Sequence, residues 1–411
     1  MKRPLFALCC AALLALAGCD TGSPAEPGTP LKALPRPLTA SEQQLIAAGN
    51  TFAFGLLKQV NAAAPDSNLF ISPLSASLAL GMTMNGAAGE TFAAMRQTLG
   101  FGTLAEGAIN RSYRDLLALL LGLDGRVKLQ IANAIFYRQG FPVEPPFLDT
   151  TRTYFGAEVR ALDFNSPGAL KTINGWAERQ TNGRIPKVLD ALPAELVMLL
   201  MNALYFKGQW TQQFDAKETR EQPFHRAGGG TVPVKMMSRA GTRLRHLRGE
   251  GFQAAELPYG RGAWAMTILL PDEGRDVNAL LAQMDAARWS AITAAMREAE
   301  MTVELPRFRL VYEDTFNRAL TNLGMGVAFD PNAADFRRIT RGGGLWIDFV
   351  KQNTFVEVNE EGTEAAAVTT VGMIDSAPPT LRVDRPFVFA LRERLSGTIL
   401  FVGKIMQPPS K

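Results

Sequence analysis

The chain has 411 residues, of which 47% are hydrophobic and 20% are charged, and its formal net charge is +4. This charge is small for the length and is interspersed along the chain, which argues against nucleic acid as a partner. The cysteines, Cys9, Cys10 and Cys19, all lie at the N-terminus. The rest of the chain therefore has no disulfide, no thiolate nucleophile and no cysteine-based metal site.

The N-terminus is typical of an export signal. Lys2 and Arg3 precede an apolar stretch, residues 5–17, that is too short to span a bilayer as a mature helix. The stretch ends in Leu16-Ala17-Gly18-Cys19, which resembles the lipobox of bacterial lipoproteins. We expect residues 1–18 to be removed as a signal peptide and Cys19 to carry the lipid. An ordinary secretory signal that contains a cysteine is the alternative.

The lipobox resemblance implies export and a lipid anchor in a bacterial membrane, on its periplasmic or cell-surface side. Each buried methylene of an acyl chain contributes about 0.8 kcal/mol, so a multiply acylated Cys19 would hold the protein stably. Asp20 follows the cysteine directly, and in some bacteria this favours the inner membrane. Residues 19–40 are rich in Pro, Gly, Ser and Thr, which predicts a semi-extended tether.

Residues 41–409 are expected to form one large domain, because no second linker and no internal repeat interrupts them. Apolar residues at helical spacing predict a helix over residues 39–60, for which Ser41 is available as the N-cap. The same pattern continues over residues 75–84 and 91–99. Helices therefore dominate the first part of the domain.

Strands and helices alternate after these helices. Continuous apolar and β-branched residues predict strands of a central sheet over residues 127–137 and 196–206, with a helix between them over residues 170–180. Short strands separated by Gly, Pro and Asp turns follow at residues 263–270, 301–305 and 398–405. The predicted class is α+β with several sheets.

The composition changes sharply at Gly362. Residues 355–358 alternate as a strand does, and a run of small and β-branched residues without proline extends from Gly362 to Pro378. Such a run lacks large side chains for a core, and it is too apolar and too prone to form strands for a simple hydrophilic loop.

The residue pattern of this run is also compatible with a β-strand. One alternating face is uncharged and the other holds the only charge, Glu364, so the segment could enter the middle of a sheet without burying a charge. Gly362 would supply the freedom to turn. A permanently paired strand and a flexible alanine-rich linker fit the composition equally well. The uncharged face consists of Thr363, Ala365, Ala367, Thr369 and Val371, and the other face of Glu364, Ala366, Val368, Thr370 and Gly372.

The segment resembles the hinge of the inhibitory serpins, whose pattern is an acidic residue, a variable residue, Gly, Thr or Ser, any residue, and then small residues. The matching residues are Glu360, Glu361, Gly362, Thr363, Glu364, Ala365, Ala366 and Ala367. Residues 68–75, 202–210, 385–389 and 400–405 resemble other serpin segments in the same order, so the resemblance covers nearly the whole domain.

The resemblance implies a serpin fold with three β-sheets, about nine helices and an exposed reactive-centre loop at about residues 360–380. It also implies a suicide-substrate inhibitor of serine or cysteine proteases rather than an enzyme. The protease cleaves the loop, forms an acyl-enzyme, and is distorted as the loop inserts into the central sheet. A monomer without cofactor or metal is expected.

The family's roles can be carried to single residues. Glu360 and Arg307 match an ion pair at the top of the central sheet, and Trp210 matches a tryptophan packed where insertion begins. Ser72, Ser75 and Asn202 match the region where strands must slide apart. The family usually has a histidine in that cluster, and this chain has Gln352. Gln352 can still donate and accept hydrogen bonds, but it cannot respond to pH.

Several residues are candidates for the position of the cut. Counting fourteen residues on from Gly362 places Ser376 before the cut, and counting back from Pro378 places Asp375 there. Asp375 would suit Asp-selective proteases and Ser376 elastase-like ones, while Met373 or Ile374 would suit subtilisin-like enzymes. Ala377 is a further alternative. We favour the bond between Asp375 and Ser376. Trypsin-like targets are disfavoured, because no Lys or Arg lies between Gly362 and Ala377.

Two other classes of function are less consistent with the sequence. A hydrolase lacks support, because His225 and His246 are the only histidines and no Gly-x-Ser-x-Gly or His-Glu-x-x-His motif is present. Glycines 228–230 lack the Lys-Ser/Thr of a phosphate loop and predict a turn between strands. A non-inhibitory serpin that acts as a binding or chaperone protein usually has bulky or charged hinge residues, unlike Thr363 and residues 365–367.

Overall fold

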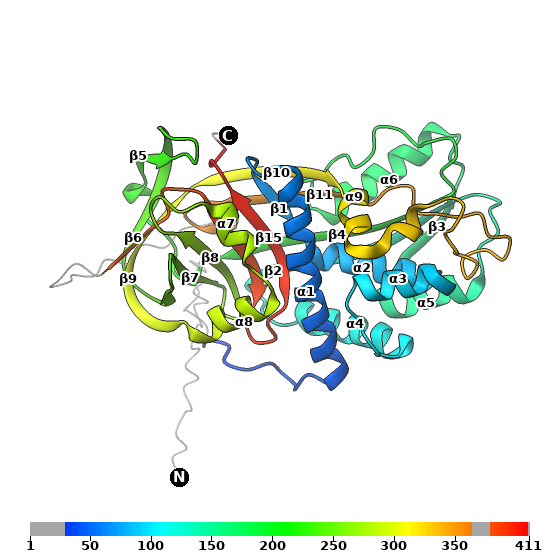
Figure 1. Cartoon of the computed structure of the whole chain (residues 1–411), viewed down its shortest axis with the longest axis horizontal. Helices are drawn as coiled ribbons and strands as arrows, with labels where there is room; N and C mark the ends of the chain where they lie inside the picture. The colour runs from blue at the N-terminus through cyan, green and yellow to red at the C-terminus, as the bar shows by residue number, and fades with distance from the viewer. Residues whose placement is uncertain (1–28, 364–378, 410–411) are drawn as a thin grey trace, which may run out of the picture.

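The computed structural model describes residues 29–363 and 379–409, and within them the chain forms nine α-helices and three β-sheets (Figure 1). The helices are α1 (Ala40–Ala63), α2 (Pro73–Met84), α3 (Gly89–Thr98), α4 (Glu106–Leu121), α5 (Pro145–Phe155), α6 (Pro167–Gln180), α7 (Val277–Ala282), α8 (Ala286–Ala295) and α9 (Asn317–Leu320). The strands are β1 (Leu69–Ile71), β2 (Val127–Arg138), β3 (Glu158–Leu162), β4 (Met198–Gln209), β5 (Arg220–His225), β6 (Thr231–Arg248), β7 (Phe252–Tyr259), β8 (Trp264–Pro271), β9 (Arg297–Pro306), β10 (Phe308–Thr315), β11 (Lys351–Val358), β12 (Gly362–Thr363), β13 (Thr380–Arg382), β14 (Phe387–Glu393) and β15 (Ile399–Ile405).

The starts of the helices follow from local capping. Thr39 caps α1, because its side chain accepts the N–H of Glu42 and the Glu42 carboxylate accepts the N–H of Thr39. The predicted helix is confirmed, but Ser41 as its N-cap is wrong, since this reciprocal pair starts the helix earlier. Ser72 caps α2 through its side chain, which accepts the N–H of Ser75, and Pro73 lies in the first turn.

The predicted strands are confirmed and divide between sheets. The strands predicted at residues 127–137 and 196–206 are β2 and β4, which pair antiparallel with Val127 opposite Gly208. They form a four-stranded sheet in the order β12-β4-β2-β3. A nine-stranded sheet in the order β1-β15-β14-β8-β7-β6-β9-β13, with β5 on β6, contains the later strands. Strands β10 and β11 form a third, two-stranded sheet.

The glycine run at residues 228–230 forms a turn, as predicted. It joins β5 to β6, whose ends pair at His225 and Thr231. Gly229 and Gly230 have φ angles of 87° and 73°, which glycine adopts without strain.

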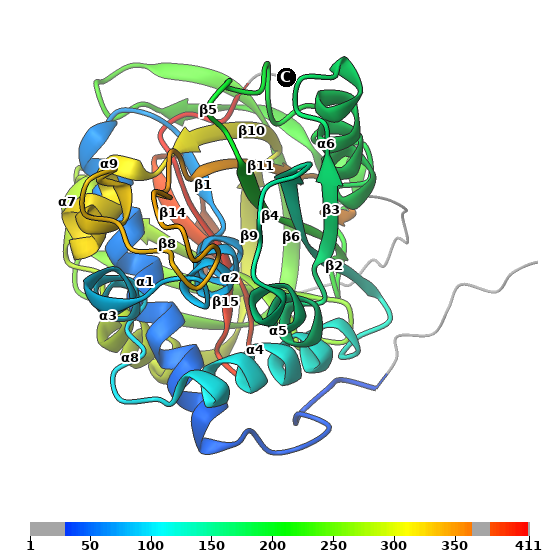
Figure 2. The same cartoon turned by 90° about the vertical axis from the view of Figure 1, so that its right-hand side faces the viewer.

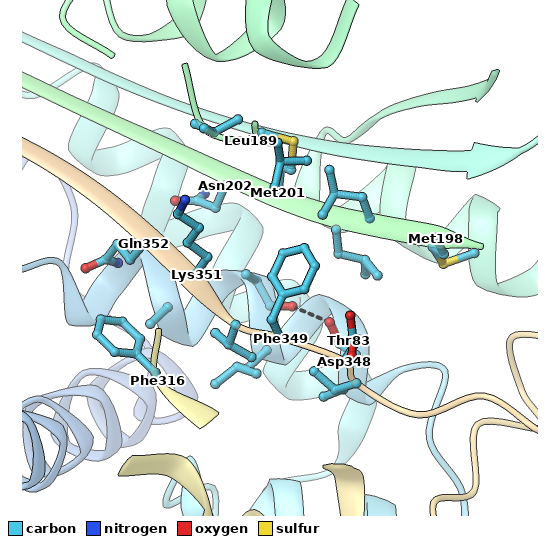
Figure 3. Close-up of a pocket in the computed structure, with 18 of the residues that line it drawn as sticks. Thr83, Leu189, Met198, Met201, Asn202, Phe316, Asp348, Phe349, Lys351 and Gln352 are labelled. Atoms are coloured by element: carbon cyan, nitrogen blue, oxygen red, sulfur yellow. Dashed lines mark hydrogen bonds between the residues drawn. The ribbon is translucent and has the colours of Figure 1, made fainter. Parts of the chain in front are cut away.

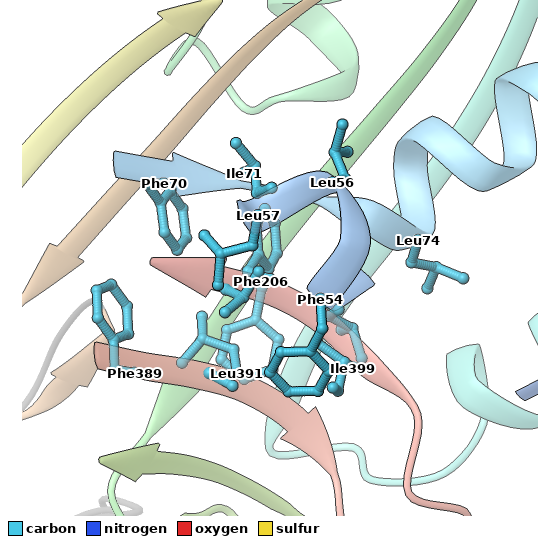
Figure 4. Packing of buried hydrophobic residues seen from close by; sticks show 14 of the residues in the cluster. Phe54, Leu56, Leu57, Phe70, Ile71, Leu74, Phe206, Phe389, Leu391 and Ile399 are labelled. Carbon is cyan, nitrogen blue, oxygen red and sulfur yellow. The ribbon is translucent and has the colours of Figure 1, made fainter. Parts of the chain in front are cut away.

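The core lies where α1 meets the nine-stranded sheet. Figure 4 shows Phe54 and Leu57 of α1 packed against Phe70 of β1 and against Phe389 and Leu391 of β14. The four-stranded sheet has α2 on one side and α6 on the other (Figure 2). A second, smaller apolar cluster, which includes Phe136, Trp176 and Leu199, joins α6 to β2 and β4. The sheet is therefore covered on both faces.

The prediction of a tether as far as residue 40 is wrong for its second half. Residues 29–38 lie along the domain, and Leu31, Leu34 and Leu38 pack against its main core. Three isolated leucines among prolines carry no helical or strand period, so the sequence pattern did not indicate this contact. Residues 19–28 lie outside the described residues. Within the described ranges, no helix is long and apolar enough to cross a membrane.

Candidate functional site

The site lies between β4 and β11. These strands run side by side but belong to different sheets, and no backbone pairing joins them within the described part of the chain. Strand β12 enters at one end, where Gly362 and Thr363 pair antiparallel with Gln209 and Gly208. The first two residues after the predicted hinge turn therefore already form a strand beside β4.

Only glycine fits at position 362. Its φ angle is 141°, and a Cβ there would lie 2.2 Å from the carbonyl oxygen of Gly208 and 2.7 Å from the Cα of Gln209. The sequence-based expectation was conformational freedom at Gly362. The structure adds a second reason, which is close approach of two backbones.

Trp210 closes the same end of the gap. Its backbone N–H donates to the Glu361 carbonyl at 2.9 Å, and its indole Nε1–H donates to the Asn359 carbonyl at 2.9 Å. The ring is buried and stacks on Tyr259, with 4.3 Å between centroids and 12° between planes. Trp210, which directly follows β4, is therefore hydrogen-bonded to the turn that precedes the hinge.

Glu360 and Arg307 lie close together, as the family resemblance implied. Arg307 Nη1 and Glu360 Oε1 are 3.7 Å apart, and the side chains are 53% and 12% exposed. The same carboxylate oxygen accepts a hydrogen bond from Thr219 Oγ1 at 2.8 Å. Thr219 was not identified from the sequence, because it lies 141 residues from Glu360 and belongs to no motif.

The geometry predicts which of the two partners contributes more to stability. Arg307→Gln is expected to lower the free energy of unfolding by less than about 1 kcal/mol, because an exposed ion pair is screened by water. Thr219→Val is expected to lower it by about 1–3 kcal/mol, because it removes a donor from a nearly buried carboxylate. Thermal unfolding of both variants measures the order, and a larger loss for Arg307→Gln would contradict it.

Gln352 joins β11 to the start of α2. Its Oε1 accepts the backbone N–H of Ser72 at 2.7 Å, and its Nε2 donates to the Ser72 carbonyl at 2.8 Å. The hydroxyl of Ser72 donates to the Leu400 carbonyl and accepts the N–H of Ser75 at 3.2 Å. Three of the residues implied for strand sliding are therefore brought together.

Asn202 faces the same gap but bonds elsewhere. Its Nδ2 donates to Asn133 Oδ1 on the neighbouring strand β2 at 2.8 Å. Within the described residues, its buried Oδ1 has no hydrogen-bond partner. A buried acceptor without a hydrogen-bond partner costs free energy. The gap therefore contains an acceptor whose hydrogen bond is not made in this conformation.

A cavity of about 650 Å³ occupies the gap. Figure 3 shows Asn202, Met201 and Met198 of β4 along one side and Gln352 of β11 on the other. The ring of Phe349, just before β11, points between the two strands and packs against the cluster under α6. Phe349 was missed from the sequence, since a single aromatic residue in a loop carries no period.

The two histidines of the chain lie on β5 and β6 and do not line the cavity. The pKa of His246 is lowered by burial, and its Nε2 lies 3.3 Å from Gln253 Oε1. His225 lies at the end of β5. Among residues 29–363 and 379–409, no group of His, Cys, Asp and Glu is placed to hold a metal ion.

Several sequence-predicted residues fall outside the described ranges. These are the lipidation site with its neighbour, Cys19 and Asp20, the rest of the hinge, Glu364, Ala365, Ala366 and Ala367, and the candidate cleavage residues, Met373, Ile374, Asp375, Ser376 and Ala377.

Comparisons with known proteins agree over most of the chain. A family model described as Serpin (serine protease inhibitor) matches residues 47–408. An uncharacterised serpin-like protein of Thermococcus kodakarensis is 35% identical over 378 residues, covering 89% of this chain and 86% of that protein. The leukocyte elastase inhibitor of Sus scrofa is 34% identical over 381 residues, covering 89% and 100%. The crystal structure of human thyroxine-binding globulin matches with a TM-score of 0.83 at 28% identity, covering 90% of this chain and all of that chain.

Proposed function

The chain belongs to the serpin family, and from this premise we propose that it inhibits serine or cysteine proteases by inserting its cleaved loop between β4 and β11. Serpins are protease inhibitors or binding proteins and not enzymes, so the loop acts as a substrate for the target. The observation that carries the proposal is β12, which stands at the head of an open gap with its first two residues already in register.

Continuing that register supports insertion of the whole run. Gly362 opposite Gln209 and Thr363 opposite Gly208 place Ala365 opposite Phe206 and Ala367 opposite Leu204. Both β4 residues belong to the face that packs on the main core, so the small loop residues would face inward. Glu364 would lie opposite Lys207 on the other face, as an opposite-charge pair.

The same register supplies a partner for Asn202. Thr369 would lie directly opposite Asn202, with both side chains on one face of the sheet. The threonine hydroxyl could then donate to Asn202 Oδ1, which has no hydrogen-bond partner among the described residues. Insertion would therefore satisfy a buried acceptor as well as fill the cavity.

The chemistry is that of an interrupted hydrolysis. The protease nucleophile attacks the carbonyl of the residue before the cut, the new amino terminus leaves, and the loop stays joined to the protease as an acyl-enzyme. Inhibition requires that insertion moves the protease before water hydrolyses the ester or thioester. The bond between Asp375 and Ser376 is the proposed cut, and Met373, Ile374 and Ala377 mark the alternatives.

The proposal includes the site of action. A lipidated Cys19 would anchor the mature chain to a bacterial membrane, and Asp20 favours the inner membrane. Proteases exposed at that surface are the proposed targets, and a monomer suffices for the mechanism.

A panel of proteases tests the proposed function. The purified chain is incubated with elastase-like, subtilisin-like and Asp-selective enzymes, and the products are separated on denaturing gels. An SDS-resistant adduct together with a released C-terminal peptide is expected, and the N-terminal sequence of that peptide identifies the cut. Cleavage by every enzyme without any adduct would contradict inhibition.

A binding protein without inhibitory activity is the second candidate. The observation that favours it is the structural similarity to thyroxine-binding globulin, which was determined in complex with a small ligand. Under this alternative, the loop would be cut without adduct and without a change in thermal stability.

Gln352 predicts how the site responds to pH. A glutamine does not titrate, so its bonds to Ser72 should persist across the physiological range. Gln352→His would place a buried imidazole there, and burial lowers the pKa of histidine below its usual 6.5 or so. The variant should match the native chain at pH 8, because the stabilising neutral form is present above the unfolded pKa. It should lose about 1–3 kcal/mol as the pH falls through the lowered folded pKa.

The measurement is the difference in melting temperature between variant and native chain at pH 8 and at pH 5, which cancels all other titrations. An equal difference at both pH values would contradict the prediction.

A further inference from the structure

Residues 29–38, here called the strap, are bound to the domain by their backbone. The N–H of Leu31 donates to the Arg261 carbonyl at 2.8 Å, and Arg261 Nε donates to the Thr29 carbonyl at 3.0 Å. Arg261 lies in the turn between β7 and β8. The two bonds in opposite directions fix the first described residues of the chain on this turn.

Side chains bind the rest of the strap. Leu31, Leu34 and Leu38 pack against the main core, each partly buried. Arg36 forms two hydrogen bonds to the buried carboxylate of Glu42 and donates to the Asp115 carbonyl of α4 at 3.2 Å. The Arg36 guanidinium also lowers the pKa of Glu42. The strap is thus held along its whole length.

The turn that holds the strap also holds the end of β4. Gly260 donates its N–H to the Gln209 carbonyl at 2.8 Å and accepts a hydrogen bond from Thr211 Oγ1 at 3.0 Å. Gln209 is the residue that pairs with Gly362 of the hinge. The turn between β7 and β8 therefore contacts both the start of the strap and the end of β4 that pairs with the hinge. The strap start and the hinge of the reactive-centre loop lie at the same end of the domain.

This end carries basic groups around an inward-facing acid. Asp124 is buried, and its two carboxylate oxygens accept hydrogen bonds from the backbone N–H groups of Arg126 and Arg261. Lys32 is exposed, and Arg126 and Arg261 are half-buried. An anionic bilayer attracts each such cation by about 1 kcal/mol near its surface, which adds to the argument from the strap contacts.

We propose that the strap orients the domain so that its hinge end faces the membrane. The inference rests on the part of the proposed function that anchors the chain at Cys19. From Cys19 to the strap, residues 19–28 can span at most about 35 Å even when fully extended. The hinge end is then the face that meets the lipid surface, and the loop is offered to proteases whose active sites lie close to that surface.

A free tether to residue 40 would give a different result. It would be more than twice as long and would leave the domain from the start of α1, so no face would be turned preferentially to the bilayer. The contacts of the strap exclude that arrangement for the described conformation.

The two ends of β2 allow a matched measurement. Lys128 lies at the hinge end of the strand, and Gln139 follows its other end, roughly 36 Å away at about 3.3 Å per residue. Both are exposed. Because the mature chain has no cysteine besides the lipidated Cys19, Lys128→Cys and Gln139→Cys can each be labelled at a single site.

The experiment uses the full lipidated chain in vesicles of phosphatidylethanolamine and phosphatidylglycerol that contain an acceptor-labelled lipid. Energy transfer from a donor at Lys128→Cys is expected to exceed that from Gln139→Cys at least about twofold, given their separation along the strand. Adding Leu31→Asp and Leu34→Asp, which release the strap, should bring the two values together.

Equal transfer from the two positions in the native strap, or stronger transfer from Gln139→Cys, would overturn the orientation. So would a chain that stays in the aqueous phase, because the anchor is its premise. The two native-strap chains decide the question even where the double aspartate variant fails to fold. Adduct formation by the same vesicles with a protease from the panel reports inhibition separately.

Discussion

Under the proposed inhibitory mechanism, replacing Thr363 with arginine is expected to turn the chain from an inhibitor into a substrate of the target protease. In the proposed inserted strand, residue 363 would lie opposite Gly208, on the face of β4 that packs on the main core. An unpaired arginine buried there costs several kcal/mol. Each 1.4 kcal/mol added to the insertion barrier slows insertion about tenfold while hydrolysis is unchanged, so the yield of adduct should fall at least about tenfold.

The matched control is the same substitution at the next residue. Glu364→Arg points outward in the inserted strand, where it would face Lys207 at a cost of no more than about 1 kcal/mol. Its adduct yield should stay close to that of the native chain. The measurement is the ratio of adduct to cleaved chain on denaturing gels, and full adduct formation by Thr363→Arg would refute the role given to the hinge.

Cleavage of the loop is expected to raise the melting temperature by at least about 10 °C. Insertion would pair the facing edges of β4 and β11 and fill the cavity of about 650 Å³. On the order of ten new backbone hydrogen bonds at about 1 kcal/mol each gives roughly 10 kcal/mol. A domain of this size has an unfolding entropy near 2 cal/mol/K per residue, so each kcal/mol shifts the melting temperature by roughly 1–2 °C.

Calorimetry of intact and nicked protein measures this shift. The nicked Thr363→Arg variant is the control, because its loop is cut but enters the sheet poorly and its melting temperature should rise far less. An unchanged melting temperature after complete cleavage of the native chain would instead support the binding-protein alternative.

Helices and strands were predicted correctly from the sequence where their residue pattern is local. The apolar, β-branched runs of β2 and β4 and the helical spacing in α1, α2 and α6 were enough to predict those elements. Strand β6 was not predicted, because its Thr231–Arg248 run alternates charged and apolar residues without a clear boundary. The amphipathic helix α4 was also missed.

The site was predicted less completely, because its contacts join distant parts of the chain. The composition of the loop indicated a segment able to become a strand, and the family resemblance placed Gln352 beside Ser72. The donor from Thr219 to Glu360 and the bond from Asn202 to Asn133 have no local signal. The strap is the clearest example, since its leucines gain meaning only against a surface formed by later residues.

The stacking of Trp210 on Tyr259 next to the hinge allows the hinge to be followed by tryptophan fluorescence. The indole is one of five in the chain, its N–H donates to the Asn359 carbonyl just before the hinge, and its ring stacks on Tyr259. A change in its polarity or stacking alters emission on the timescale of the motion itself. Stopped-flow fluorescence of unlabelled protein can therefore measure the rate of the proposed insertion for comparison with the rate of hydrolysis. The Trp210→Phe variant provides the background signal of the other indoles.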